Sequence, residues 1–83
     1  MDWAAIIEIA LTIIKGCIDK DSEEVVRERL RSGGPRVTMG IRRSLRQEGL
    51  RGRELREATR QAVSELSDAT DEELDELIAE AQD

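Results

Sequence analysis

The sequence predicts an all-α fold, a small bundle of about five short helices that forms one domain over residues 1–83. Apolar residues recur at spacings of three and four, and no window alternates with period two as a strand would. Glycine, proline and capping residues divide the chain at several points. A chain of 83 residues builds only a small core, so we expect self-association or docking on a partner to complete the bundle.

The first expected helix covers residues 2–19 and is the most apolar part of the chain. On a helical wheel its polar residues share one narrow sector, and apolar residues fill an arc of about 200°. An ordinary surface helix needs an apolar stripe of only about 100°, so this helix has two sides to bury. It either runs through the middle of its own bundle or contacts another protein with one side. The candidate contact residues are Trp3, Ile6, Ile9, Ile13 and Ile14.

This apolar segment does not predict a membrane span. It is about sixteen residues long and contains Glu8 and Lys15, whereas a spanning helix needs about twenty apolar residues in succession. It has no basic leading region and no small-residue cleavage site, so we expect no secretory signal. An interfacial membrane helix is disfavoured because the polar sector is not basic. We therefore expect a protein that is not secreted and that lies in the cytoplasm or inside a protein particle.

The second expected helix covers about residues 22–32. Asp21 and Glu24 have the spacing of a capping box, with Asp21 as the N-cap, and Gly33 and Gly34 supply the end. The apolar edge of this helix is thin. It consists of Val25, Val26 and Leu30.

Two further helices are expected before residue 67. Pro35 suits the first turn of a third helix that runs to Glu48, and Gly40 in its middle predicts close approach of a neighbouring backbone. A fourth helix covers about residues 53–66. The inward residues of the two helices are Val37, Ile41, Leu45, Leu55, Ala58, Thr59, Ala62 and Leu66.

The last expected helix covers about residues 70–82 and is acidic. Thr70 and Glu73 have the spacing of a second capping box, and the acidic residues of the first turn suit the positive end of the helix dipole. Its inward residues are Leu74, Leu77, Ile78 and Ala81. Its acidic face consists of Asp71, Glu72, Asp75, Glu76 and Glu80.

Charge is segregated along the chain. All eleven arginines lie between Arg27 and Arg60, and residues 61–83 contain nine acidic residues and no basic one. Residues 1–26 carry a net charge of −4, residues 27–60 carry +7 and residues 61–83 carry −9. We expect the last helix to fold back antiparallel onto the fourth and to bring Asp75, Glu76 and Glu80 near the arginines.

The third and fourth helices each present arginines on the side opposite their apolar residues. This basic face consists of Arg36, Arg42, Arg43, Arg46, Arg53, Arg56 and Arg60. Three interpretations stay open: a solvated face balanced by nearby carboxylates, a surface that binds nucleic-acid phosphates, and a surface that forms salt bridges with another subunit or partner. The net charge of −6 opposes nucleic acid at long range, and no aromatic residue in this region could stack on a base.

Residues 42–60 contain Gly49-Leu50 and Glu54-Leu55, and they resemble the opening half of the helix-turn-helix domains of phage repressors. The sequence departs from this pattern at two positions. Arg56 stands where those domains have a small residue that packs the two helices together, and Arg60 stands where they have the turn glycine. The residues that follow are acidic where a recognition helix approaches phosphates. No DNA-reading residues are carried over from this resemblance.

Composition excludes several kinds of chemistry. With no histidine and one cysteine, the chain lacks an imidazole base, a Ser-His-Asp relay, an internal disulfide and a four-cysteine zinc site. Cys17 lies in an apolar stripe and is expected to be buried and unreactive. The acidic run 71–76 lies on a helix rather than in a calcium loop. We expect no enzyme activity, cofactor, metal or small-molecule substrate.

The sequence therefore favours a non-enzymatic assembly or interaction protein that self-associates or docks on a larger complex. A phage virion or another multi-subunit particle is a candidate setting for a short helical chain of this kind. Two alternatives remain. One is an arginine-rich accessory protein that binds nucleic acid and counter-charges itself with its acidic helix, and the other is a small acidic inhibitor of a basic partner protein.

Overall fold

The computed structural model describes residues 1–82. Over this range the chain forms five α-helices and no strand, which confirms the predicted all-α bundle. The helices are α1 (Trp3–Cys17), α2 (Glu23–Ser32), α3 (Pro35–Gln47), α4 (Gly52–Asp68) and α5 (Asp71–Gln82). Each lies within about two residues of the span that periodicity and capping predicted.

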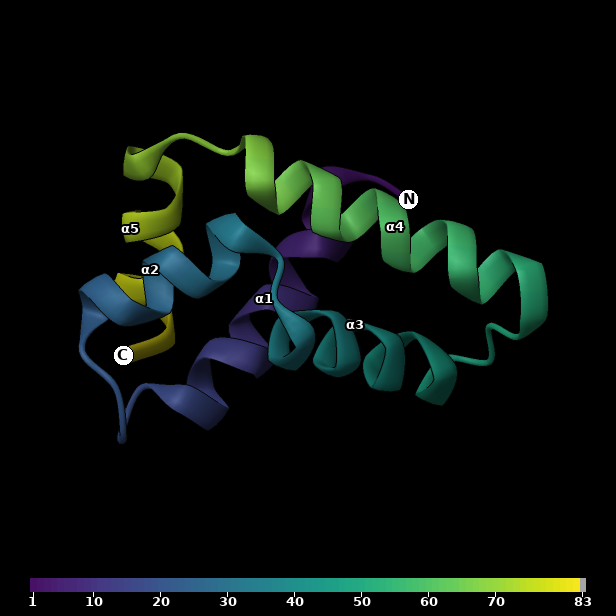
Figure 1. Cartoon of the computed structure of the whole chain (residues 1–83), viewed down its shortest axis with the longest axis horizontal. Coiled ribbons are helices and arrows are strands. Elements are labelled where there is room, and N and C mark those ends of the chain that lie inside the picture. Colours follow the sequence, from purple (N-terminus) through teal and green to yellow (C-terminus); the bar gives the residue numbers. More distant parts are fainter. Residues whose placement is uncertain (83) are drawn as a thin grey trace.

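The apolar helix α1 runs through the middle of the bundle (Figure 1). It packs against α5, α3 and α4, which surround it on several sides. Ile6 and Ile14 are 0% exposed, and Ile9 is also buried. The wide apolar arc of this helix is thus used mainly for intramolecular packing. Of the two arrangements that the sequence left open, the structure adopts the one in which α1 is a core helix.

The other four helices form two pairs around α1. The α3 and α4 helices form a helical hairpin: they run antiparallel and contact each other extensively (Figure 1). The α5 helix packs against α1 and α2, and α2 also contacts α4. The predicted inward residues of α5, which are Leu74, Leu77, Ile78 and Ala81, are all buried in the shared core.

Capping residues explain where the helices begin. The Thr70 hydroxyl accepts a hydrogen bond from Glu73 N at 3.1 Å, and the Glu73 carboxylate accepts one from Thr70 N at 2.9 Å, which confirms the second capping box. The first capping box is wrong: Ser22 caps α2 by accepting from Val25 N at 3.3 Å. Asp21 instead forms an ion pair with Arg29, whose guanidinium competes successfully for the carboxylate.

Three smaller expectations are also corrected. Val25, expected on the apolar edge of α2, is 41% exposed because α2 turns only its Val26 and Leu30 side toward the core. Cys17 lies in the last turn of α1 and is half-buried rather than buried. Gly40 is approached by a side chain rather than a backbone: a Cβ atom at this position would lie 3.0 Å from Ile13 Cγ1 of α1.

Over residues 1–82, none of the helices combines the length and the apolar character needed to cross a membrane.

Candidate interaction site on the α3–α4 hairpin

The acidic helix α5 pairs with arginines of α2 rather than with those of α3 and α4. Asp75 accepts a hydrogen bond from Arg27 at 2.9 Å, and Asp71 forms an ion pair with Arg31. The hydrogen bond from Arg27 to Asp75 raises the pKa of the guanidinium further, and the charge of Asp75 adds to this. The expected antiparallel docking of α5 on α4 is therefore wrong.

Apolar contacts explain this placement of α5. Leu74, Leu77 and Ile78 are buried in the core that α5 shares with α1 and α2. The hydroxyl of Ser67 donates a hydrogen bond to Arg31 O at 2.7 Å, which anchors the end of α4 beside α2. The chain then turns at Ala69, itself buried, so α5 is directed onto α1 and α2 and away from the arginines of α3.

The seven arginines of the predicted basic face are all exposed, and we refer to them as the arginine face. Within residues 1–82, none of the seven forms an ion pair or a side-chain hydrogen bond. The three arginines that do form ion pairs are Arg27, Arg29 and Arg31 of α2. The acidic helix α5 thus pairs with α2, and the arginine face keeps its positive potential.

Part of the arginine face borders a groove between α3 and α4, which we call the arginine groove. Its volume is about 480 Å³. Arg42 contributes from α3, and Arg56 and Arg60 contribute from α4. Hydroxyl groups and one apolar side chain complete the lining, with a single carboxylate at one end. These residues are Thr38, Thr59, Val63, Ser64, Ser67 and Asp68.

A second hollow of about 350 Å³ continues the arginine groove toward the α3–α4 turn. It shares Arg42 and Arg56 with the groove and adds Arg46 and Arg51. Sequence reasoning missed Arg51 because this residue precedes α4 and lies on no helical wheel. Five arginines therefore converge on one continuous surface, where guanidinium groups can bind carboxylate or phosphate oxygens in bidentate geometry.

The remaining arginines of the face lie outside this surface. Arg36 borders a separate hollow with Arg29 and Pro35 at the start of α3. Arg43 and Arg53 are exposed and border none of the hollows described above. The structure thus brings together four of the seven predicted basic residues, Arg42, Arg46, Arg56 and Arg60, and keeps the other three apart.

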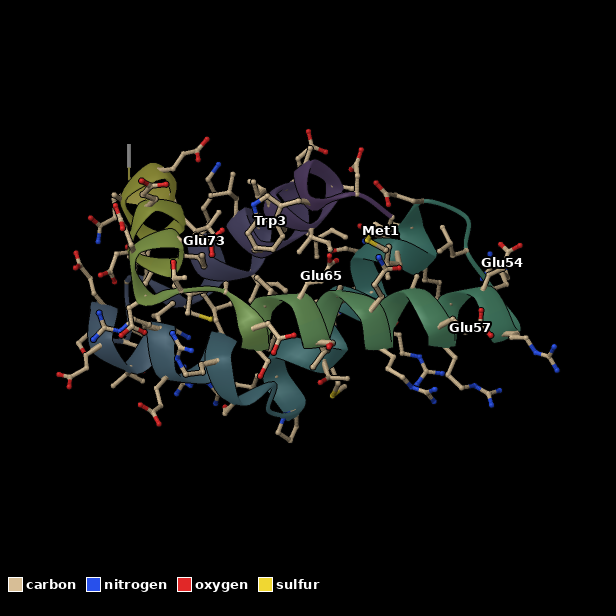
Figure 2. The ribbon with its side chains drawn as sticks, turned by 90° about the horizontal axis from the view of Figure 1, so that it is seen from above. Met1, Trp3, Glu54, Glu57, Glu65 and Glu73 are labelled. Carbon is tan, nitrogen blue, oxygen red and sulfur yellow. The ribbon has the colours of Figure 1, made fainter. Side chains whose placement is uncertain are left out.

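The opposite flank of α4 is acidic, which sequence reasoning missed. Figure 2 shows Glu54 and Glu65 on the side of α4 that lies toward Met1 and Trp3, while nitrogen-tipped side chains gather along the other edge. A hollow of about 420 Å³ on this side is bordered by Glu48, Glu54 and Glu57. Apolar side chains share it, and they are those of Met1, Ala5, Leu45, Leu50 and Ala58.

Trp3 lies in a neighbouring hollow of about 340 Å³. The half-buried indole shares this hollow with Glu65, Asp68 and Glu73, which come from α4 and α5 (Figure 2). We call the carboxylates of the two hollows the acidic flank: Glu48, Glu54, Glu57, Glu65, Asp68 and Glu73. A wheel of α4 would have found most of them, because Glu54, Glu57, Glu65 and Asp68 fall on one side at helical spacing.

The other predicted contact residues are distributed as follows. Ile6, Ile9 and Ile14 are enclosed in the core and offer no surface, and Ile13 is half-buried against Gly40. Of the five apolar candidates, Trp3 borders one of the hollows described above. The predicted acidic residues of α5 are all exposed; Asp71 and Asp75 pair with α2, and Glu72, Glu76 and Glu80 form no ion pair within residues 1–82.

Comparison with known proteins found no matching family model, curated protein or solved structure. The likeness of residues 42–60 to repressor domains is thus supported by no family model.

Proposed function

We propose that the chain is a non-enzymatic interaction protein whose arginine groove binds an acidic surface of a protein partner. One observation carries the proposal: within residues 1–82 no arginine of the arginine face forms an ion pair, although the same molecule contains an acidic helix that pairs with α2. Exposed like charges that converge on a groove raise the local concentration of an oppositely charged partner and orient it.

The composition of the groove favours carboxylates of a protein over the phosphates of a nucleic acid. Hydroxyls and Val63 line the groove together with Arg56 and Arg60, so the surface suits side chains that combine an apolar stem with a carboxylate. The acidic flank lies on the same helix, so a phosphate backbone lying across α4 would meet Glu54 and Glu57 as well as the arginines. The chain also has no Phe or Tyr to stack on bases.

The test is calorimetric titration of the protein with a short Glu-rich helical peptide. We expect binding that weakens with salt and that is lost in the double variant Arg56→Gln/Arg60→Gln. The matched control is Lys15→Gln/Lys20→Gln, which removes the same two charges from outside the arginine face and should bind as the wild type does. Equal affinities for the two variants would exclude the arginine groove as the binding surface.

A parallel titration with duplex DNA addresses the nucleic-acid alternative. Binding to DNA that is tighter than binding to the peptide, with a log–log salt slope of about −0.9 per phosphate neutralised, would replace the proposed partner with nucleic acid.

A further inference from the structure

We propose that the acidic partner is a second copy of this chain, so that the arginine face of one copy docks on the acidic flank of the next. This inference rests on the proposed function and names its partner. Complementary charge on the two sides of α4 and the chemistry of the Trp3 hollow support this partner.

The Trp3 hollow has the composition of a binding site for a guanidinium group. An arginine placed over the indole face is attracted by the ring quadrupole, and carboxylates at the ring edge accept its N–H donors. Trp3 is the only aromatic residue of the chain, and it lies beside Glu65, Asp68 and Glu73 with part of its ring exposed (Figure 2). The neighbouring hollow adds apolar surface at Met1, which is 40% exposed.

The arginine face supplies the matching groups. Arginine side chains cover apolar surface with their methylene stems and place their charge at the rim, which suits a hollow that mixes Met1 and Leu50 with carboxylates. Arg42, Arg46, Arg51, Arg56 and Arg60 converge within one continuous surface and make no internal ion pair within residues 1–82. Carboxylates from the acidic flank would supply the missing counter-charges.

The position of the two surfaces determines the kind of assembly. Asp68 borders both surfaces, but Glu54 and Glu65 lie on the side of α4 toward Met1 and Trp3, away from the arginine groove (Figure 2). A partner that covers Arg56 and Arg60 of a copy therefore leaves Glu54 and Glu65 of that copy free. Such a head-to-tail contact is heterologous, and repeated contacts of this kind form a closed ring or an open filament.

The experiment uses two complementary variants and sedimentation equilibrium. The acceptor, Arg56→Glu/Arg60→Glu, keeps the acidic flank and reverses two charges of the arginine groove. The donor, Trp3→Phe/Glu54→Lys/Glu65→Lys, changes no residue that lines the arginine groove, reverses two charges of the acidic flank and does not contribute indole fluorescence. We expect wild-type mass to increase with concentration, and each variant alone to remain at 9.3 kDa.

A mixture of the two variants is the decisive sample. We expect a 1:1 heterodimer with twice the mass of one chain and no further growth, because one functional face of each kind remains. The fluorescence of Trp3 in the acceptor should shift when the donor is added, and salt should reverse both changes. Circular dichroism verifies folding. If charge reversal unfolds a variant, the milder variant Arg56→Gln/Arg60→Gln replaces it. Measured alone, this variant should remain monomeric at concentrations at which the wild type associates.

Either of two results overturns the inference. In the first, the wild type stays monomeric at all concentrations and the mixture of variants does not dimerise. In the second, the wild type associates and the arginine substitutions leave its association unchanged. Binding of the Glu-rich peptide then separates the two claims. If the peptide still binds the arginine groove, the proposed function stands and the partner is another acidic protein. If the peptide also fails to bind, both proposals are wrong.

Discussion

Gly33 and Gly52 adopt nearly the same left-handed backbone, with φ values of 64° and 59°, but their surroundings differ. A Cβ atom at Gly33 would lie 2.7 Å from Val63 Cγ1. At Gly52, apart from the adjacent residues and the nearby backbone of α4, no atom of residues 1–82 lies within 4 Å of that position. Both alanine substitutions carry the backbone strain of about 1–2 kcal/mol. We expect Gly33→Ala to lower the free energy of unfolding by at least about 1 kcal/mol more than Gly52→Ala, measured by urea denaturation.

Equal losses at the two positions would show that Val63 moves aside at little cost. That result would also imply a soft contact between the α2–α3 connection and α4.

Gly16 and Gly40 form a second matched pair, each within a helix and each without a positive φ. Gly16 is exposed, and a Cβ atom added there would have no atom of residues 1–82 within 4 Å apart from the adjacent residues and the backbone of α1. Gly16→Ala should therefore raise the free energy of unfolding by about 0.5–1 kcal/mol. At Gly40 the new methyl group would lie 3.0 Å from Ile13 Cγ1, so Gly40→Ala should lose this gain. An equal gain at both positions, in the same urea measurement, would contradict tight packing of α1 on α3.

At the scale of the helices, side chains determine where α5 begins, through the capping box of Thr70 and Glu73. We expect Thr70→Ala to lower the free energy of unfolding by about 1 kcal/mol, because Glu73 N loses its acceptor at the start of α5. Thr70→Ser retains the hydroxyl and should cost much less. A loss in the serine variant as large as that in the alanine variant would attribute the effect to the threonine methyl group.

Helix α5 is held by its apolar side. Truncation after Leu66 removes Leu74, Leu77 and Ile78 from the core, and buried leucines contribute about 2–5 kcal/mol each, so we expect loss of cooperative thermal unfolding by circular dichroism. The control, Glu72→Gln/Glu76→Gln/Glu80→Gln, neutralises exposed acids and should remain folded. A truncated chain with an unchanged melting curve would show that α5 is dispensable for the bundle.

The whole molecule is polarised across α4, with an arginine face on one flank and carboxylates on the other. Its folding depends on an apolar core, whereas the proposed assembly depends on exposed charges. Raising NaCl from about 0.1 M to about 1 M shortens the screening length from about 10 Å to about 3 Å. We therefore expect self-association to decrease strongly while the melting temperature changes little, measured by sedimentation and calorimetry in the same buffers.

If instead the melting temperature falls in parallel with the assembled mass, the contact between copies would be part of what keeps each chain folded. Association that is unaffected by salt would indicate an apolar interface and contradict the role of the arginine face.

Several features of this protein could be predicted from the sequence, and the structure explains why. The five helices follow from periodicity and punctuation, since an apolar stripe such as Val37, Ile41 and Leu45 specifies both the helix and its buried side. The exposure of the arginine face follows from the same wheels. The acidic flank could have been found on the wheel of α4, but Arg51 and Trp3 join their hollows only through the tertiary fold.

By itself the sequence determined the all-α class, the approximate helix boundaries and most of the residues that face inward, because these depend on local chain geometry and on side-chain polarity. Only the tertiary structure decided which helices pair: α5 meets α1 and α2 rather than α4, and α1 becomes the centre of the core. Exposed ion pairs contribute only about 0–1 kcal/mol each and cannot select a neighbour against apolar packing. The arrangement therefore depends on how the apolar faces fit together, and no local pattern encodes that fit.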